Sequence, residues 1–273
     1  MLAISNCRSL WPRIPRVFLR VPGNVLLRLV FVTTLAGFGF SNSARGGEAE
    51  TGRARFVARL QELLEAAQKR HLAEPTNAVA AWEFARACFE RAEYPTNDTE
   101  RAVLAQQGIA TCRQLLSRQI RIAPVHYYLA MNLGQLARTK KLGALRIVDE
   151  MEREFKAARQ LDEHLDFAGP DRNLGLLYFE APAFASVGSR SKARHHLQRA
   201  VELAPDYPEN RLNLAEAYLK WSDNKGATHE LKALEKLWPA AQANLTGEDW
   251  AASWSSWEKK LKWTRKTIED RAK

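Results

Sequence analysis

Two prolines 34 residues apart, Pro205 and Pro239, do more than any other feature to constrain the fold of this chain. The segment between them carries two sets of apolar residues at helical spacing, separated by a polar turn. Because proline cannot continue a helix, Pro239 predicts where the second helix closes. The segment is therefore expected to form a pair of antiparallel helices that buries its apolar faces by stacking on similar pairs. The residues that define the pair are Leu214, Ala215 and Tyr218 on the first helix and Ala227, Leu231 and Leu234 on the second.

Similar pairs precede this segment in the chain. The nearest has a six-residue insert at Ala181–Ser186 and ends at Pro205. An earlier one begins after Pro124 and continues into a long helix expected at residues 143–165. A more degenerate pair is expected within residues 77–123. The defining residues of the nearest pair are Leu174, Gly175 and Tyr178, then Ala193, Leu197 and Ala200; those of the earlier pairs are Leu133 and Gly134, and Trp82, Ala85, Phe89, Ala105, Ile109 and Cys112.

Amphipathic helices are expected at both ends of the repeats. One covers residues 53–72, and the other starts near Thr246 and Asp249, where an acidic side chain suits the positive end of a helix dipole. A stripe that includes Trp250, Trp254 and Trp257 lies along one face of the second helix. This stripe is expected to shield the last repeat, because stacked repeats need a cap at each end. Docking at a membrane interface is the alternative role for the tryptophans.

The period and the Leu-small-x-x-Tyr pattern resemble the tetratricopeptide repeat (TPR) family, in its bacterial exported form. The resemblance implies an all-α fold: a right-handed superhelical stack of helix-turn-helix pairs with N- and C-terminal capping helices. It gives an export segment at 1–44, a capping helix at 45–76, repeats at 77–239 and a tryptophan-rich cap at 240–273. The clearest repeats span 168–207 and 208–239, and the whole stack is expected to form one domain.

In a TPR stack the first helix of each pair lines a concave groove, which predicts where a ligand binds. Asparagine precedes the Leu-small motif three times, at Asn132, Asn173 and Asn213. A side-chain amide can pair with both the N–H and the C=O of a peptide, and a similar asparagine ladder occurs in O-linked N-acetylglucosamine transferases. The alternative is that each asparagine braces a neighbouring turn. Other side chains expected near the groove are Tyr128, Met131, Arg172, Leu176, Phe179, Glu216 and Lys220.

The function that these features favour is non-enzymatic binding of a protein or peptide partner by a scaffold of the cell envelope. A weaker resemblance, carried by the long helix at 143–165 and the insert at Ala181–Ser186, is to the T component of TRAP-type transporters. That resemblance implies a periplasmic accessory protein that binds a small apolar ligand. The sequence leaves this second function open.

Catalysis, metal binding and nucleic-acid binding have little support in the sequence. The histidines show no metal-ligand spacing, and neither a glycine-rich phosphate loop nor a nucleophile elbow occurs. His195 and His196 are expected on a solvated, basic surface. No enzyme, cofactor or metal is therefore predicted. Five of the 41 basic side chains and none of the 31 acidic ones lie in residues 1–44. The rest of the chain therefore lacks the large excess of basic residues that is typical of a protein that binds nucleic acid.

The first 44 residues predict export to the periplasm or beyond. Arginines precede an apolar stretch, Leu29–Phe40, that is followed by small and polar residues. The stretch is shorter than the roughly 20 residues that a transmembrane helix needs. A cleaved signal is favoured; an uncleaved anchor, which would be the chain's only membrane contact, and a cytoplasmic location are the alternatives.

Two cysteines, Cys88 and Cys112, fall on successive predicted helices. In an oxidising compartment the pair could form a disulfide. The alternative is that both are small buried residues, since free cysteine is among the most buried residue types.

Overall fold

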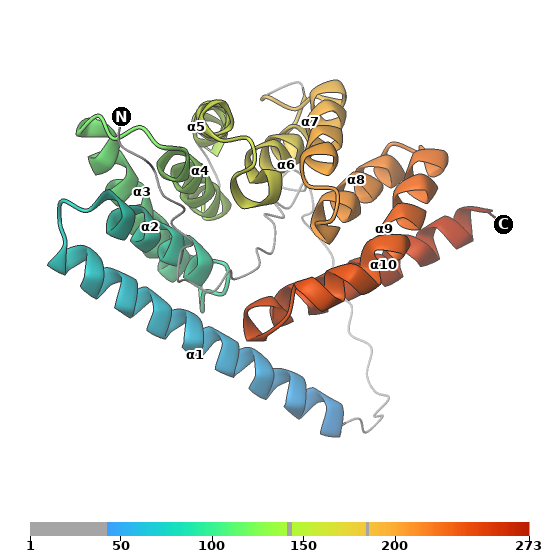
Figure 1. The fold of residues 1–273 in the computed structure, drawn as a ribbon, viewed down its shortest axis with the longest axis horizontal. Helices are drawn as coiled ribbons and strands as arrows, with labels where there is room; N and C mark the ends of the chain where they lie inside the picture. The colour runs from blue at the N-terminus through green and yellow to red at the C-terminus, as the bar shows by residue number, and fades with distance from the viewer. Residues whose placement is uncertain (1–42, 141–143, 184–185, 273) are drawn as a thin grey trace, which may run out of the picture. The chain divides into compact units, whose positions relative to one another are not determined.

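The computed structural model describes residues 43–140, 144–183 and 186–272, and within these ranges it is helical and contains no strand (Figure 1). The predicted export segment, up to residue 42, and two residues of the predicted insert lie outside these ranges. The helices are α1 (Ser43–Ala73), α2 (Ala78–Ala92), α3 (Asp98–Ser117), α4 (Ala123–Arg138), α5 (Ala144–Leu161), α6 (Leu165–Glu180), α7 (Arg190–Leu203), α8 (Pro208–Lys220), α9 (Asn224–Asn244) and α10 (Glu248–Ala272).

The helices fall into two compact units. The unit that ends at Leu203 contains α1 to α7, and a second unit contains α8 to α10. The sequence predicts a single stack through both, and its continuity and handedness across the junction stay predictions. In the α1–α7 unit, α2 packs with α3, α4 with α5 and α6 with α7, and α1 covers α2. In the α8–α10 unit, α8 packs with α9, and α10 packs on both.

The helices of a pair differ in burial. The first helices, α2, α4, α6 and α8, are buried on nearly every face, whereas the second helices bury one stripe each. Close approach within a pair depends on small residues, as the sequence predicts. At Gly175 of α6, a Cβ atom would lie 2.7 Å from Cγ of Leu197 on α7 and 3.0 Å from its backbone nitrogen. The absent side chain therefore sets the spacing between α6 and α7.

The long helix expected at residues 143–165 is shorter in the structure, because α5 ends at Leu161. Within α6, Asp166, Phe167 and Ala168 have φ values of 55°, 55° and 60°, in the left-handed region. That conformation costs an L-residue about 1–2 kcal/mol. The sequence gives no warning of this turn, because none of the three residues is a glycine.

In the α8–α10 unit, the prediction that Pro239 closes the second helix is wrong. Helix α9 continues through Pro239 to Asn244. Proline inside a helix removes one backbone hydrogen bond and costs about 3 kcal/mol, so packing of the residues around it must offset the loss. Ala241 in that turn is buried, and the ring of Trp238 packs edge-on against Trp254 of α10 at 5.2 Å between centroids.

None of the described helices has both the length and the apolar character required to span a bilayer.

Candidate functional site

Asn132, on α4, is fully buried and braces two other helices. Its Nδ2 donates to the backbone oxygen of Ala85 on α2 at 2.9 Å and to that of Tyr128 at 2.8 Å. Both acceptors are carbonyls, so they fix which end of the amide is the nitrogen. On α3, a Cβ atom at Gly108 would lie 2.5 Å from the Asn132 amide. The side chain therefore fills a close contact between α2, α3 and α4.

Asn173, on α6, makes the corresponding contact one pair later. It is 1% exposed, and its Nδ2 donates to Tyr127 Oη at 2.8 Å and to Met131 Sδ at 3.1 Å, both on α4. Each of the two asparagines thus reaches back to the first helix of the preceding pair. This is the bracing role that the sequence left open as an alternative, and contact with a ligand stays a prediction for both. The Oδ1 atoms of Asn132 and Asn173 have no hydrogen-bond partner among the described residues.

Asn213, on α8, is equally buried but has a different partner. Its Oδ1 accepts a hydrogen bond from Lys260 Nζ of α10 at 2.8 Å. The same ammonium group lies 3.0 Å from Glu216, which is also on the predicted groove face. Near the end of α8, Arg271 of α10 donates to the backbone oxygen of Leu219 at 2.7 Å. Helix α10 therefore covers the face of α8 on which Asn213 lies.

The remaining side chains predicted to line the groove differ in accessibility. Phe179 and Glu216 are partly exposed, and Lys220 is exposed. The others are buried: Tyr128, Met131, Arg172 and Leu176. A partner that contacts the described first helices from solvent would therefore meet few of the predicted residues.

Arg172 stabilises the left-handed turn that opens α6. Its guanidinium group donates to the backbone oxygens of Asp166 and Phe167 at 3.1 and 3.0 Å, and to the Asp166 carboxylate at 2.7 Å. Tyr127 Oη donates to the same carboxylate at 2.7 Å and also accepts the hydrogen bond from Asn173. Tyr127 and Asp166 were not predicted from sequence, because the link depends on a turn that the sequence does not reveal.

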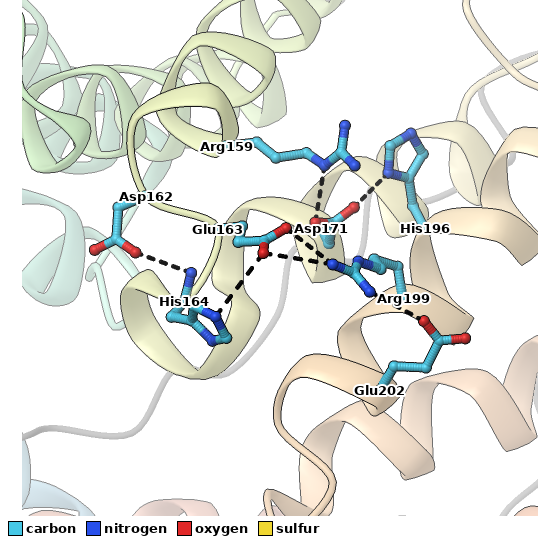
Figure 2. A network of polar contacts seen from close by, with 8 residues as sticks. All are labelled: Arg159, Asp162, Glu163, His164, Asp171, His196, Arg199 and Glu202. Carbon is cyan, nitrogen blue, oxygen red and sulfur yellow. Dashed lines mark hydrogen bonds and ion pairs between the residues drawn. The ribbon is translucent and has the colours of Figure 1, made fainter.

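A second polar network joins α5, α6 and α7 (Figure 2). The buried carboxylate of Asp171 lies 3.0 Å from Arg159 Nε and 2.7 Å from His196 Nδ1. The prediction that His195 and His196 share a solvated surface is wrong for His196, which is 8% exposed, whereas His195 is exposed. The two rings differ because adjacent residues of a helix point to different faces.

The surroundings of His196 favour a structural role for this network. Its ring stacks on Tyr178 at 5.4 Å between centroids, and Tyr178 Oη donates to Glu152 at 2.7 Å. Burial, together with the hydrogen bond to Glu152, raises the pKa of Tyr178. Among the described residues, no group of three or more His, Cys, Asp or Glu side chains is placed to hold a metal ion.

Cys88 of α2 and Cys112 of α3 are both fully buried free thiols. Burial raises the pKa of Cys88 to about 12 and also raises that of Cys112. The possible disulfide is not formed in the structure, and the alternative of two small buried residues describes their surroundings. Thiols in such apolar sites are poor nucleophiles.

Comparison with known proteins identifies the fold. A solved structure, TTC0263, a thermophilic TPR protein of Thermus thermophilus, matches with a TM-score of 0.52 and 21% identity. The match covers 72% of this chain and 97% of that one. No family model and no curated protein matches the sequence. The chain therefore has the all-helical repeat fold of that TPR protein.

Proposed function

We propose that this protein is a non-enzymatic scaffold that binds a protein or peptide partner in the cell envelope. The observation that carries the proposal is the TPR-type stack of helix pairs, because such repeats display extended surfaces suited to polypeptides. Three of the polar side chains predicted to line the groove are used internally: Asn132, Asn173 and Arg172 join neighbouring helices or hold a turn. Binding is therefore assigned to surfaces around the repeats rather than to a buried reaction centre.

The N-terminal sequence supports the envelope part of the proposal. The arginine-bearing N-terminal segment with its apolar stretch has the order of a secretory signal. Fractionation of cells that express a C-terminally tagged chain, with N-terminal sequencing of the mature protein, tests this directly. Tagged protein found in the cytoplasm with Met1 intact would overturn the location without affecting the binding function.

Partner capture tests the binding function. The tagged chain carries a photo-crosslinking residue at exposed Lys220, or at exposed Gln160 on α5 as the matched control. A protein cross-linked from Lys220 and absent from the Gln160 control supports the scaffold, provided that the purified partner then binds in vitro. Native mass spectrometry of the same preparation tests the alternative. A stoichiometric small apolar molecule without any protein partner would favour the TRAP-type accessory function.

A further inference from the structure

An open groove of about 690 Å³ lies between α1 and α3, away from the asparagine positions described above. Helices α1 and α3 both pack on α2. Gln61, Leu64 and Gln68 of α1 form one side of the groove. The other side consists of Asn97, which caps α3, and of the α3 residues Thr99, Glu100, Val103, Leu104 and Gln107. No part of the bracing networks described above uses this groove.

The apolar part of the groove offers a place for one side chain. Leu64 and Leu104 are 6% and 7% exposed, whereas Val103 beside them is 49% exposed. Val103 is thus a large apolar side chain that lies in water at the edge of a buried apolar surface. A ligand that removes such a side chain from water gains about 25 cal/mol of free energy per Å² of apolar surface buried.

Two glutamines in the groove have unused hydrogen-bonding capacity. The side chains of Gln68 and Gln107 are exposed, and neither side-chain amide forms a hydrogen bond with another described residue. The hydroxyl of Thr111 donates to the backbone oxygen of Gln107 and leaves its amide available. Gln61 differs, because it donates to Glu65 and accepts from Arg91. A free glutamine amide offers two N–H donors and a carbonyl acceptor, which complement the C=O and N–H of a peptide.

The charge of the lining narrows the class of ligand. Glu100 is the only ionisable residue in the lining. Its carboxylate is paired with the guanidinium group of Arg91 at 2.5 Å. It also accepts hydrogen bonds from the backbone N–H and the hydroxyl of Thr96. The lining supplies no cation for a phosphate or carboxylate and no unpaired carboxylate for a cation. Neutral amides beside an apolar surface match a peptide main chain that carries an apolar side chain.

We propose that the groove between α1 and α3 binds an extended, uncharged polypeptide segment. Its main chain pairs with Gln68 and Gln107, and one apolar side chain packs on Val103. This inference rests on the proposed scaffold function and specifies the peptide that the scaffold takes. Recognition through the main chain makes the site tolerant of sequence at other positions of the peptide.

Selection from a phage-displayed library of random heptapeptides, panned on the full chain, tests the proposal. Enriched peptides should share one apolar position and be poor in charged residues. Synthetic versions should bind Gln107→Glu about fivefold more weakly, because a carboxylate accepts but does not donate. Val103→Lys should weaken binding about tenfold, and N-methylation of the peptide backbone should abolish it.

Gln114→Glu is the matched control, because Gln114 is exposed on the same helix but does not line the groove. It should leave affinity unchanged, and circular dichroism should show equal helicity for all variants. Peptides that bind the wild type and the groove variants equally would overturn the α1–α3 site and leave the scaffold function standing. A library that yields no binding peptide would also overturn the site, whereas partner capture decides the scaffold function independently.

Discussion

The same Asn-Leu-small motif has different partners in the two units. In the α1–α7 unit, Asn132 and Asn173 donate to the first helix of the preceding pair. In the α8–α10 unit, Asn213 instead accepts from Lys260, a residue of the terminal helix. The motif therefore specifies a buried amide next to a close helix contact, and the neighbouring helix decides which hydrogen bond that amide makes.

Deletion of residues 246–273 should have the largest effect, because it removes the helix that covers α8. Trp250 and Trp257, at 8% and 3% exposed, would be lost from around Tyr207, whose ring lies 5.4 Å from that of Trp257. We expect aggregation and loss of the α8–α9 helices, while α1 to α7 keep a separate melting transition. Calorimetry and light scattering measure this, with the exposed substitution Lys262→Ala as control. A soluble monomer with full helicity would show that α10 is not a cap.

Gly175→Leu should disrupt the pair formed by α6 and α7. Even Gly175→Ala should destabilise by about 1–3 kcal/mol, since its Cβ would meet Leu197, although alanine favours helix by about 1 kcal/mol over glycine. The equivalent residue in α8 is Ala215, which already carries a Cβ atom while 1% exposed. Ala215→Gly should therefore create no clash and cost about 1 kcal/mol of helix propensity, plus about 1 kcal/mol for the buried methyl group that is lost. Thermal unfolding compares the Gly175 variants with Ala215→Gly. An unchanged melting temperature for Gly175→Leu would show that Gly175 does not lie at the close contact between α6 and α7.

Asn132→Ala should cost more than Asn213→Ala. The first change leaves the Ala85 carbonyl without its side-chain donor in a buried contact, a loss of about 1–3 kcal/mol. The second leaves Lys260 paired with Glu216 and removes a buried Nδ2 that has no partner among the described residues, so it should cost less than about 1 kcal/mol. Urea unfolding gives both values. Equal costs would mean that the two asparagines do not differ in their bracing roles.

Lys260→Met should have the smallest effect. Lys260 and Glu216 have side chains 27% and 12% exposed, and ion pairs near the surface contribute about 0–1 kcal/mol. A double-mutant cycle with Asn213→Ala should give a coupling below about 1 kcal/mol. A coupling of several kcal/mol would instead identify Lys260 as the main anchor of α10.

Local pattern was enough to predict much of the fold and little of the candidate site. The helix pairs, the small residue at Gly175 and the terminal helices follow from helical spacing. Pro239 was misjudged, because a local rule for helix ends ignores the packing that carries α9 past it. The sequence singled out the asparagines as a repeated feature, but their burial depends on residues that lie 47 positions away in the chain, as in the bonds from Asn132 to Ala85 and from Lys260 to Asn213.

The sequence by itself determined that this chain forms helices and pairs them, because apolar periodicity and small residues act over one or two turns. Only the tertiary structure decided that Arg172 and Tyr127 stabilise a left-handed turn at Asp166, and that α1 and α3 leave a groove beside Val103. Each of these features depends on which faces of separate helices meet. That outcome is set by packing of the whole unit, since a side chain's partners are fixed only when distant segments are brought together.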